Sequence, residues 1–430
     1  MNQAAFVHDL RLRYQDEILQ VMQDLVRIPS QNMPPLGEER DCQETIAAYL
    51  RRAGLPVDLY EPDQVPGLVK HPFYWPGREY HNRPNLCSSL PGKGDGRSLL
   101  LTGHVDTVAL GEADWTYPPF GAEIHNGHLY GLGSVDMKGA MGAMLVLYKA
   151  VAEQQIPRRG ALSFESVVDE EEAGVNSTIA GRLRYGPMDG AVIPEITSLQ
   201  VYPAARGALI THLLFSSTQG TWLEVGTQDA PQADVVRQMG LILTALPELN
   251  ARRQQVVAPP LYRSYPEPAP AQVTKVYAGG WGSAVPIAVP LEGRIELILQ
   301  SLPGEQRSAV LGELETWLAG VIERHPQDFA TRPQVHFPRR WMVPTAMDKG
   351  HPLVTTLAGS VARVTGRQPA VLGAPYPCDL FARQRIFGMP ALIFGPSGAN
   401  AHAPDEYVEL ESVFQFWESL LLFILQWCGV

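Results

Sequence analysis

The spacing of apolar and polar positions divides the 430-residue chain into an outer α/β pattern and a second unit within it. Short apolar runs at 98–103, 161–168 and 189–194 are typical of buried strands, because a parallel strand covered on both faces has no polar side. Apolar residues at helical spacing lie between these runs, at 137–155 and 176–186. This alternation predicts a mixed, mostly parallel sheet with helices on both faces.

A new unit begins after Arg206-Gly207, where the pattern of elements changes. From there to about residue 347 the order is strand, helix, two strands, helix and strand, which is the split arrangement of ferredoxin-like domains. A chain of this length also exceeds one ordinary core. We therefore expect an outer domain built from 1–206 and 348–430, with an α+β domain inserted at 207–347.

Composition excludes several classes of partner. The chain carries 34 basic and 45 acidic residues, and no basic patch stands out, which argues against nucleic acid. No stretch approaches about 18 apolar residues without a charge, so we expect neither a membrane span nor a signal peptide. The four cysteines are scattered without a CxxC pair, which favours a reducing, cytoplasmic compartment over a disulfide framework or a thiolate metal site.

Acidic and imidazole side chains follow four of the predicted strands, at 98–103, 161–168, 189–194 and 390–395. In open α/β sheets the functional crevice lies at the carboxyl ends of the strands, so these side chains are expected to meet at one edge. That convergence carries more weight than any single residue. In chain order, the residues after the strands are His104 and Asp106, then Glu170 and Glu171, then Glu195, and finally His402.

Each candidate also has an ordinary structural explanation when it is taken alone. Asp136 opens a predicted helix, where Asp is a favoured N-cap. The stretch 104–106 is compatible with an exposed turn, and the acidic row 169–172 with a solvated loop. Glu195 and His402 are compatible with capping or surface roles. All of these explanations must hold together to exclude a functional site, and we therefore favour a site.

The chemistry of the set indicates metal ions. A metal-bound His104 oriented by Asp106 is a common arrangement, and one residue of the pair Glu170 and Glu171 suits a ligand while its neighbour suits a general base. Two histidines and three carboxylates suit Zn²⁺, or Co²⁺ or Mn²⁺. Five ligands with one shared carboxylate, Asp136, predict two divalent ions about 3.5–4 Å apart.

These stretches resemble a known group of metallohydrolases. The group includes aminoacylase, acetylornithine deacetylase, succinyl-diaminopimelate desuccinylase and the glutamate carboxypeptidases. The resemblance covers the chain almost end to end, with the motifs in the group's order. The matching segments are TGHVDTV, LYGLGSVDMKGA, VVDEEEAG, VIPE and AHAPDEYV.

The resemblance implies a role for each residue. His104 and Glu195 are implied as ligands of one metal, Glu171 and His402 as ligands of the other, and Asp136 as the bridge, with a cis peptide bond to Met137. It further implies Glu170 as the base and Asp106 as the residue that orients His104. It also implies that the inserted domain is a lid and dimerisation domain, and hence a homodimer.

Three positions depart from the group. The resemblance implies an oxyanion-stabilising His, a substrate-binding Asn and a carboxylate-clamping Arg, where this chain has Glu224, Ser283 and Gln300. Loss of a bidentate Arg weakens recognition of a carboxylate. These positions are retained as candidate substrate-binding residues, and they favour a substrate without the usual free α-carboxylate.

We therefore expect a two-metal-dependent amidohydrolase that removes an acetyl, formyl or similar group from a small N-acylated amine or amino-acid-like substrate. Metal-activated water and Glu170 would carry out the reaction, and aminopyrimidine-type deformylation is among the activities that the resemblance implies. A metallo-dipeptidase or carboxypeptidase is the first alternative. A non-catalytic metal-binding scaffold is the second, although a pure scaffold has no need of Glu170 as a base.

Overall fold

The computed structural model describes residues 3–217, 223 and 234–429. The chain divides into two compact units. Unit 1 comprises residues 1–204, 346–374 and 378–430, and unit 2 comprises residues 205–345 and 375–377. Unit 2 therefore interrupts unit 1 in the sequence, and the inserted domain expected from the sequence spans 207–347.

The central sheet of unit 1 positions the candidate residues. Its strands run in the order β10-β17-β9-β5-β8-β4-β3, and β15 (Thr345–Ala346) and β16 (Val371–Ala374) also pair with β10. Antiparallel strands lie at the sides, with β10 (Val201–Ala205) next to β17, and with β4 (Asn85–Leu90) and β3 (Asp58–Tyr60) next to β8. The middle strands are parallel to one another, which confirms the predicted type of sheet: β17 (Ala391–Ile393), β9 (Ala191–Ile193), β5 (Leu99–His104) and β8 (Leu162–Val167).

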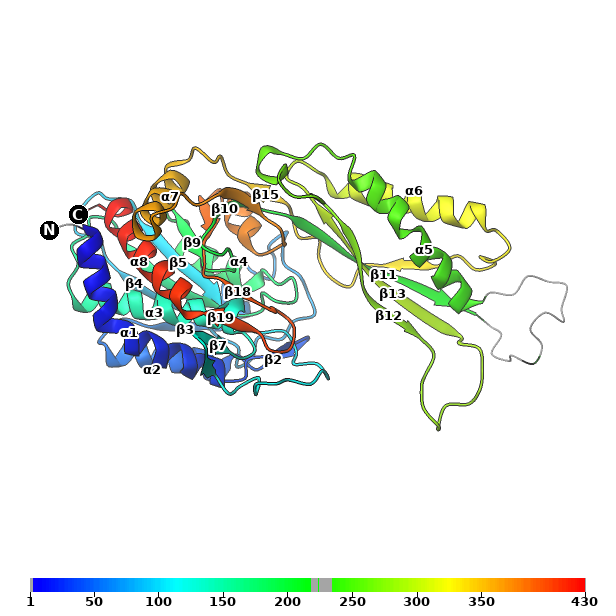
Figure 1. Cartoon of the computed structure of the whole chain (residues 1–430), viewed down its shortest axis with the longest axis horizontal. Helices are drawn as coiled ribbons and strands as arrows, with labels where there is room; N and C mark the ends of the chain where they lie inside the picture. The colour runs from blue at the N-terminus through cyan, green and yellow to red at the C-terminus, as the bar shows by residue number, and fades with distance from the viewer. Residues whose placement is uncertain (1–2, 218–222, 224–233, 430) are drawn as a thin grey trace. The chain divides into compact units, whose positions relative to one another are not determined.

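Helices cover both faces of this sheet (Figure 1). Neighbouring residues of a strand point to opposite faces, and β8 shows both sides. The ring of Phe164 lies 5.8 Å from that of Tyr148 on α3 (Gly139–Glu153). The next residue, Glu165, pairs with Arg182 of α4 (Asn176–Tyr185). The predicted coverage of both faces is therefore confirmed.

The helices α3 and α8 (Leu410–Trp427) of unit 1 are mostly buried. Helices α1 (Gln3–Arg27) and α8 pack against α3, and α7 (Pro352–Thr365) packs against α8, while α2 (Arg40–Arg52) lies by β4. A helix that is apolar on nearly all sides is normally buried in protein or lipid. Within the described residues, no helix is long and apolar enough to cross a membrane. Most side chains of α8 are buried within unit 1.

A small sheet in unit 1 carries the loop with His402. Its strands pair in the order β18 (Gly398–Ala399), β19 (Tyr407–Glu409), β7 (His128–Tyr130) and β6 (Glu123–His125). His402 lies in the connection between β18 and β19. A separate short hairpin, β1 (Asn32–Met33) with β2 (Leu36–Gly37), lies between α1 and α2 in the sequence.

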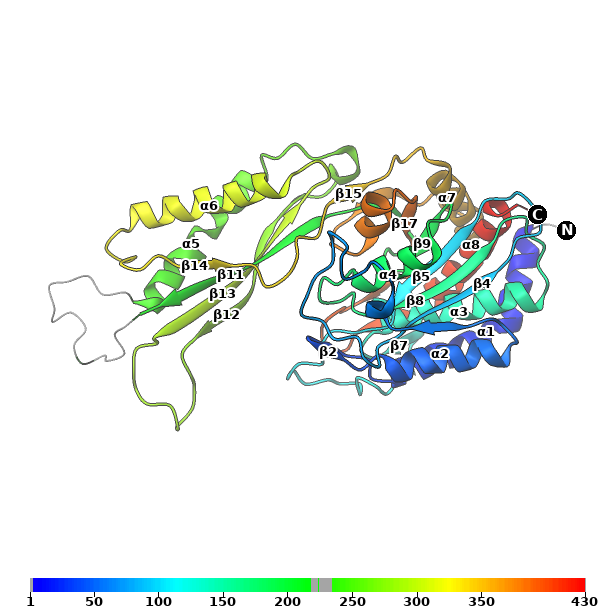
Figure 2. The ribbon, with the colours of Figure 1, turned by 180° about the vertical axis from the view of Figure 1, so that it is seen from behind.

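Unit 2 follows the predicted ferredoxin-like order of elements (Figure 2). Its antiparallel sheet has the strand order β12 (Ala271–Ala278), β13 (Glu292–Ser301), β11 (Gly207–Ser216) and β14 (Gln334–His336). The helices α5 (Val235–Arg253) and α6 (Arg307–Arg324) share a core with this sheet. Alternate residues of β13, such as Leu297 and Leu299, are buried in that core, and Trp317 of α6 donates a hydrogen bond from Nε1 to the Ala245 carbonyl of α5 at 3.1 Å.

Candidate metal centre

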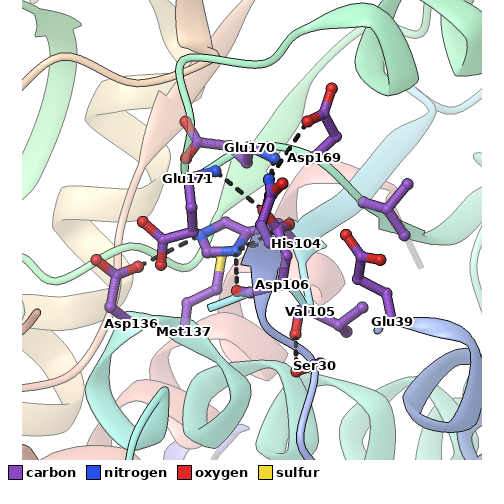
Figure 3. A network of polar contacts seen from close by, with 12 residues as sticks. Ser30, Glu39, His104, Val105, Asp106, Asp136, Met137, Asp169, Glu170 and Glu171 are labelled. Atoms are coloured by element: carbon purple, nitrogen blue, oxygen red, sulfur yellow. Dashed lines mark hydrogen bonds and ion pairs between the residues drawn. The ribbon is translucent and has the colours of Figure 1, made fainter. Parts of the chain in front are cut away.

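The five predicted metal ligands converge beyond the carboxyl ends of the parallel strands. His104 ends β5, Glu171 follows β8, Glu195 follows β9, and His402 follows β17 by way of β18. Asp136 lies in the turn of Ser134–Lys138, directly before α3. Figure 3 shows His104, Asp136 and Glu171 pointing toward one another. The sheet therefore brings together side chains that are almost 300 residues apart in the sequence.

Asp136 lies between the two histidines. His104 Nε2 is 3.3 Å from Asp136 Oδ1, and His402 Nε2 is 3.2 Å from Asp136 Oδ2. On the other side of each histidine, Glu195 Oε1 lies 3.6 Å from His104 Nε2, and Glu171 Oε2 lies 2.9 Å from His402 Nε2. The side chains form two groups, His104 with Glu195 and His402 with Glu171, which share Asp136.

The turn that carries Asp136 is held by the carboxylate of Glu406. Glu406 Oε1 accepts hydrogen bonds from the N–H groups of Val135 (2.8 Å) and Asp136 (3.1 Å), and Oε2 accepts one from Gly133 (2.9 Å). Asp136 has non-helical backbone angles and is followed by the cis peptide bond that the resemblance implies. The N-cap position of α3 is Lys138, two residues later, and the Asp136 carboxylate faces the two histidines instead.

Asp106 organises two parts of the centre. Its main-chain carbonyl accepts a hydrogen bond from His104 Nδ1 at 2.9 Å, which leaves Nε2 facing the acidic side chains. Its carboxylate takes a different role from the expected pairing with the imidazole, because Oδ1 is 3.6 Å from Nδ1. Oδ2 instead accepts hydrogen bonds from the N–H groups of Glu170 (2.9 Å) and Glu171 (3.0 Å), and from Asn32 Nδ2 (2.9 Å).

The acidic row 169–172 is not a uniformly solvated loop. Asp169 is fully buried, accepts a hydrogen bond from the Tyr80 hydroxyl at 2.7 Å and lies 3.3 Å from Arg78 Nε. Its φ of 64° is in the left-handed region, where the chain turns between β8 and Glu170. The Asp169 carboxylate thus lies apart from the candidate centre, with Tyr80 and Arg78. Glu170 and Glu171 are the residues of the row that contribute to the centre.

Burial and mutual repulsion shift the pKa values at the centre. Burial, with the nearby Asp136 charge adding to it, raises the pKa of Glu171 to about 7 and that of Glu195 to about 8. Burial alone would lower the pKa of His402, but the carboxylates of Glu171 and Asp136 raise it to about 12. Carboxylates packed this closely are stabilised as anions by cationic charge among them.

The residues present fit divalent cations. Two atoms that face the centre, His104 Nε2 and Glu171 Oε1, are buried and have no hydrogen-bond partner in the described part of the chain. Ligand atoms of His104, Asp136 and Glu171 lie within 4.8 Å of one another, and so do those of His104, Glu170 and Glu195. Imidazole nitrogen and carboxylate oxygen are donors that Zn²⁺, Co²⁺ and Mn²⁺ accept.

The three candidate substrate-binding residues belong to the sequence of unit 2. Glu224 lies outside the described residues. Ser283 is exposed in the turn between β12 and β13. Gln300 lies near the end of β13, where its side-chain oxygen accepts a hydrogen bond from Arg206 Nη1. Gln300 therefore has a partner inside its own unit.

Several residues that support the centre were not singled out from the sequence. Asn32 binds the Asp106 carboxylate, Glu406 binds the Asp136 turn, and the main chain of Asp379 binds Glu170. Glu406 stands within the motif AHAPDEYV, and Asp379 forms an i, i+4 pair with Arg383, which is a recognisable helical spacing. Nothing in the local sequence of these residues indicates which distant residues they bind.

The chain is similar to known proteins over most of its length. Residues 100–426 match the family model for peptidase family M20/M25/M40. Over 96% of this chain, 26% of residues are identical to the N-formyl-4-amino-5-aminomethyl-2-methylpyrimidine deformylase of Halalkalibacterium halodurans, and 95% of that protein is covered.

Solved structures give the same fold. The dipeptidase Dug1p of Saccharomyces cerevisiae is similar with a TM-score of 0.81 and 12% identity, over 100% of this chain and 99% of that one. The YXEP protein of Bacillus subtilis, described as a dinuclear metal binding peptidase, has a TM-score of 0.56 and 14% identity, with 96% and 99% covered. The fold, the resemblance and the expectation of an enzyme that hydrolyses amide bonds are therefore confirmed. The chain belongs to peptidase family M20/M25/M40.

Proposed function

We propose that the protein is a two-metal amidohydrolase that removes a formyl, acetyl or similar acyl group from a small N-acylated amine. The observation that carries the proposal is the place of Glu170, whose carboxylate shares a group of ligand atoms with His104 and Glu195, within 4.8 Å of one another. A deformylase relative that covers 96% of the chain supports a formyl amide as the bond that is cleaved.

We assign His104 and Glu195 to one ion and Glu171 and His402 to the other, with Asp136 shared. Zn²⁺ is the first candidate, and Co²⁺ or Mn²⁺ is compatible with the same donors. When bound, two such ions supply Lewis-acid polarisation of an amide carbonyl and lower the pKa of water.

The chain's own residues then handle the proton. Glu170 accepts a proton from the attacking water and donates it to the amine nitrogen as the C–N bond breaks. Asp106 holds the main chain of Glu170 and its neighbour Glu171 through Oδ2, which keeps base and ligand in a constant relation. In this proposal Glu170 serves as the base. Asp106 orients His104 through its carbonyl and the segment of Glu170 and Glu171 through its carboxylate.

The substrate class follows from the residues that replace a carboxylate clamp. Gln300 is neutral and shares its side-chain oxygen with Arg206. A neutral amide offers no bidentate, charged contact to an α-carboxylate. With Ser283 and Glu224 at the other two divergent positions, these residues support an uncharged N-acyl amine, such as an N-formyl aminopyrimidine, over an ordinary N-acetyl amino acid.

A substrate panel tests the proposal. Purified protein loaded with Zn²⁺, Co²⁺ or Mn²⁺ is assayed on N-formyl-4-amino-5-aminomethyl-2-methylpyrimidine, N-acetyl amino acids and dipeptides. We expect kcat/KM to be highest for the N-formyl pyrimidine. Release of amino acids from dipeptides without any deacylation would favour the peptidase alternative, and turnover of none of these would favour the scaffold.

Glu170→Gln separates catalysis from metal binding. We expect the variant to lose about 10³-fold or more in kcat while it retains both ions, because Gln has nearly the same shape but cannot accept the proton. Unchanged turnover would remove Glu170 as the base.

We also expect a cytoplasmic homodimer, which cell fractionation and sedimentation velocity test directly.

A further inference from the structure

The carboxylate of Glu170 is held from a distant segment. The main-chain N–H of Asp379 donates a hydrogen bond to Glu170 Oε1 at 3.1 Å, although the two residues are 209 positions apart. Only 2% of Asp379 and 8% of Glu170 is exposed. Within the described residues, no other protein group donates a hydrogen bond to this carboxylate, so this contact governs its orientation.

The side chain of Asp379 is fixed at both of its oxygens. Oδ1 accepts a hydrogen bond from Arg383 Nη1 at 2.6 Å, and Oδ2 accepts one from the Thr178 hydroxyl at 2.5 Å. Rotation of the carboxylate would break one or both of these buried, charge-assisted contacts. The Asp379 main chain, and with it the N–H that reaches Glu170, is therefore held in one position.

Arg383 ties this segment to the central sheet. Its Nη2 donates to the Thr102 hydroxyl at 2.8 Å, and that hydroxyl donates to Glu165 Oε2 at 2.9 Å. Glu165 Oε1 in turn pairs with Arg182 at 2.6 Å. Thr102 lies on β5, two residues before His104, and alternate residues of a strand share a face. The network thus links the Glu170 contact to the strand that carries a candidate metal ligand.

The charges in the network cancel. Arg182 and Arg383 balance Glu165 and Asp379, and all four side chains are buried. Because the charges balance, the network adds no net charge beside Glu170. Buried ion pairs contribute little net stability compared with apolar packing, because removing the charges from water costs free energy. We therefore attribute these pairs to positioning rather than to stability.

We propose that Asp379 is a positioning residue that holds the Glu170 carboxylate in line for proton transfer, anchored through Arg383 and Thr178. The inference rests on the proposed function, because it assigns Glu170 as the base. A small displacement of a catalytic group reduces turnover strongly without changing substrate binding. A network that served stability alone would leave turnover per folded enzyme unchanged.

Kinetics of Asp379→Asn on the N-formyl pyrimidine test this inference. Asn keeps the size of the side chain, but its amide group cannot accept from both Arg383 and Thr178. We expect kcat to fall about 10–100-fold, with KM and the two-ion metal content unchanged. Thr178→Val removes one contact at constant shape and is expected to lower kcat about 3–10-fold.

A matched control separates geometry from stability. Trp317→Phe alters the core of unit 2 and is expected to lower stability while kcat stays at the wild-type value. Wild-type kcat in Asp379→Asn, loss of metal, or a change confined to KM would each overturn the inference. If Asp379→Asn does not fold, Thr178→Val decides by the same measurements.

The experiments distinguish an error in the proposed function from an error in the positioning role of Asp379. If wild-type protein is active, Glu170→Gln is inactive and Asp379→Asn is fully active, the inference is wrong and the proposed function stands. If wild-type protein turns over nothing in the panel, the proposed function is wrong and the inference falls with it.

Discussion

Glu406 Oε1 accepts a hydrogen bond from the N–H of Val135 at 2.8 Å, one residue before the shared carboxylate of the candidate centre. The same carboxylate receives the N–H groups of Gly133 and Asp136. Glu406 is buried and lies four residues after His402 in the sequence. One side chain therefore couples the loop of one histidine to the turn that carries Asp136.

This coupling predicts that Glu406→Gln weakens metal binding. Gln can present only one oxygen, and its NH₂ group would face a main-chain donor, so the Asp136 turn should shift. We expect a loss of about 10–100-fold in metal affinity with the fold retained. Competition against a chromogenic chelator measures the affinity, and circular dichroism checks the fold. Glu409→Gln, on the same small sheet, is the control, and equal affinities in the two variants would contradict the prediction.

Removal of metal should destabilise the protein. Without cations, the partly buried carboxylates of Asp136 and Glu171 and the buried carboxylate of Glu195 repel one another, which opposes folding. An ion present at 100 times its Kd stabilises the folded state by about 2.7 kcal/mol. We expect a chelator to lower Tm by about 5 °C or more and added Zn²⁺ to restore it. Glu171→Gln with Glu195→Gln should reduce this response, whereas an unchanged response in that double variant would place the ion elsewhere.

The network at the amino ends of β5 and β9 gives a pH-dependent prediction. The N–H and hydroxyl of Ser98 donate to Asp189 Oδ2 at 2.8 Å and 2.7 Å, and these hydrogen bonds lower the pKa of Asp189. The pKa of Asp189 is lower in the folded protein than in the unfolded chain. The ionised carboxylate therefore stabilises the folded protein at any pH above its unfolded-state pKa. This stabilisation is lost as the pH falls through the folded-state pKa.

Asp189→Asn should therefore reduce the free energy of unfolding by about 0.5–1 kcal/mol at pH 7. The loss is small because Asp189 is exposed and solvent screens its charge. The difference from wild type should shrink between about pH 5 and pH 3. Urea titrations of the metal-free forms at several pH values measure it. Asp9→Asn, an exposed position on α1, is the control, and a difference that grows on acidification would show the opposite linkage.

The main elements of the centre could be predicted from the sequence because they are local. Three of the four apolar runs are followed at once by an acidic or imidazole residue, the fourth leads into the loop that contains His402, and parallel strands deliver such residues to one edge. The structure places those strands side by side as β17-β9-β5-β8. Strand pairing then brings His104 and Glu195 to the same edge from positions 91 residues apart in the sequence.

Contacts between distant segments could not be predicted in the same way. A two-residue spacing places Asp106 near His104, but it does not determine whether the carbonyl or the carboxylate makes the contact. The sequence of the acidic row with Asp169 is compatible with a solvated loop, and nothing in it indicates the buried contact with Tyr80, about 90 residues earlier in the sequence. The contact of Asp379 with Glu170 likewise depends on the tertiary fold, because no local pattern relates the two residues.

Gln300→Arg tests whether this position selects the substrate. A guanidinium at residue 300 restores the charged fork that the resemblance implies, so kcat/KM for N-acetyl amino acids relative to the N-formyl pyrimidine should rise about 10-fold or more. The same change removes one of the two acceptors of Arg206 Nη1, the other being the Pro375 carbonyl, and places a second cation beside it, so unit 2 should lose about 1–3 kcal/mol of stability. Gln300→Met removes the acceptor without adding charge, and it should lower stability while the substrate ratio stays at the wild-type value. Substrate competition and thermal melts measure the two effects, and a ratio unchanged by Gln300→Arg would mean that residue 300 does not govern recognition of the carboxylate.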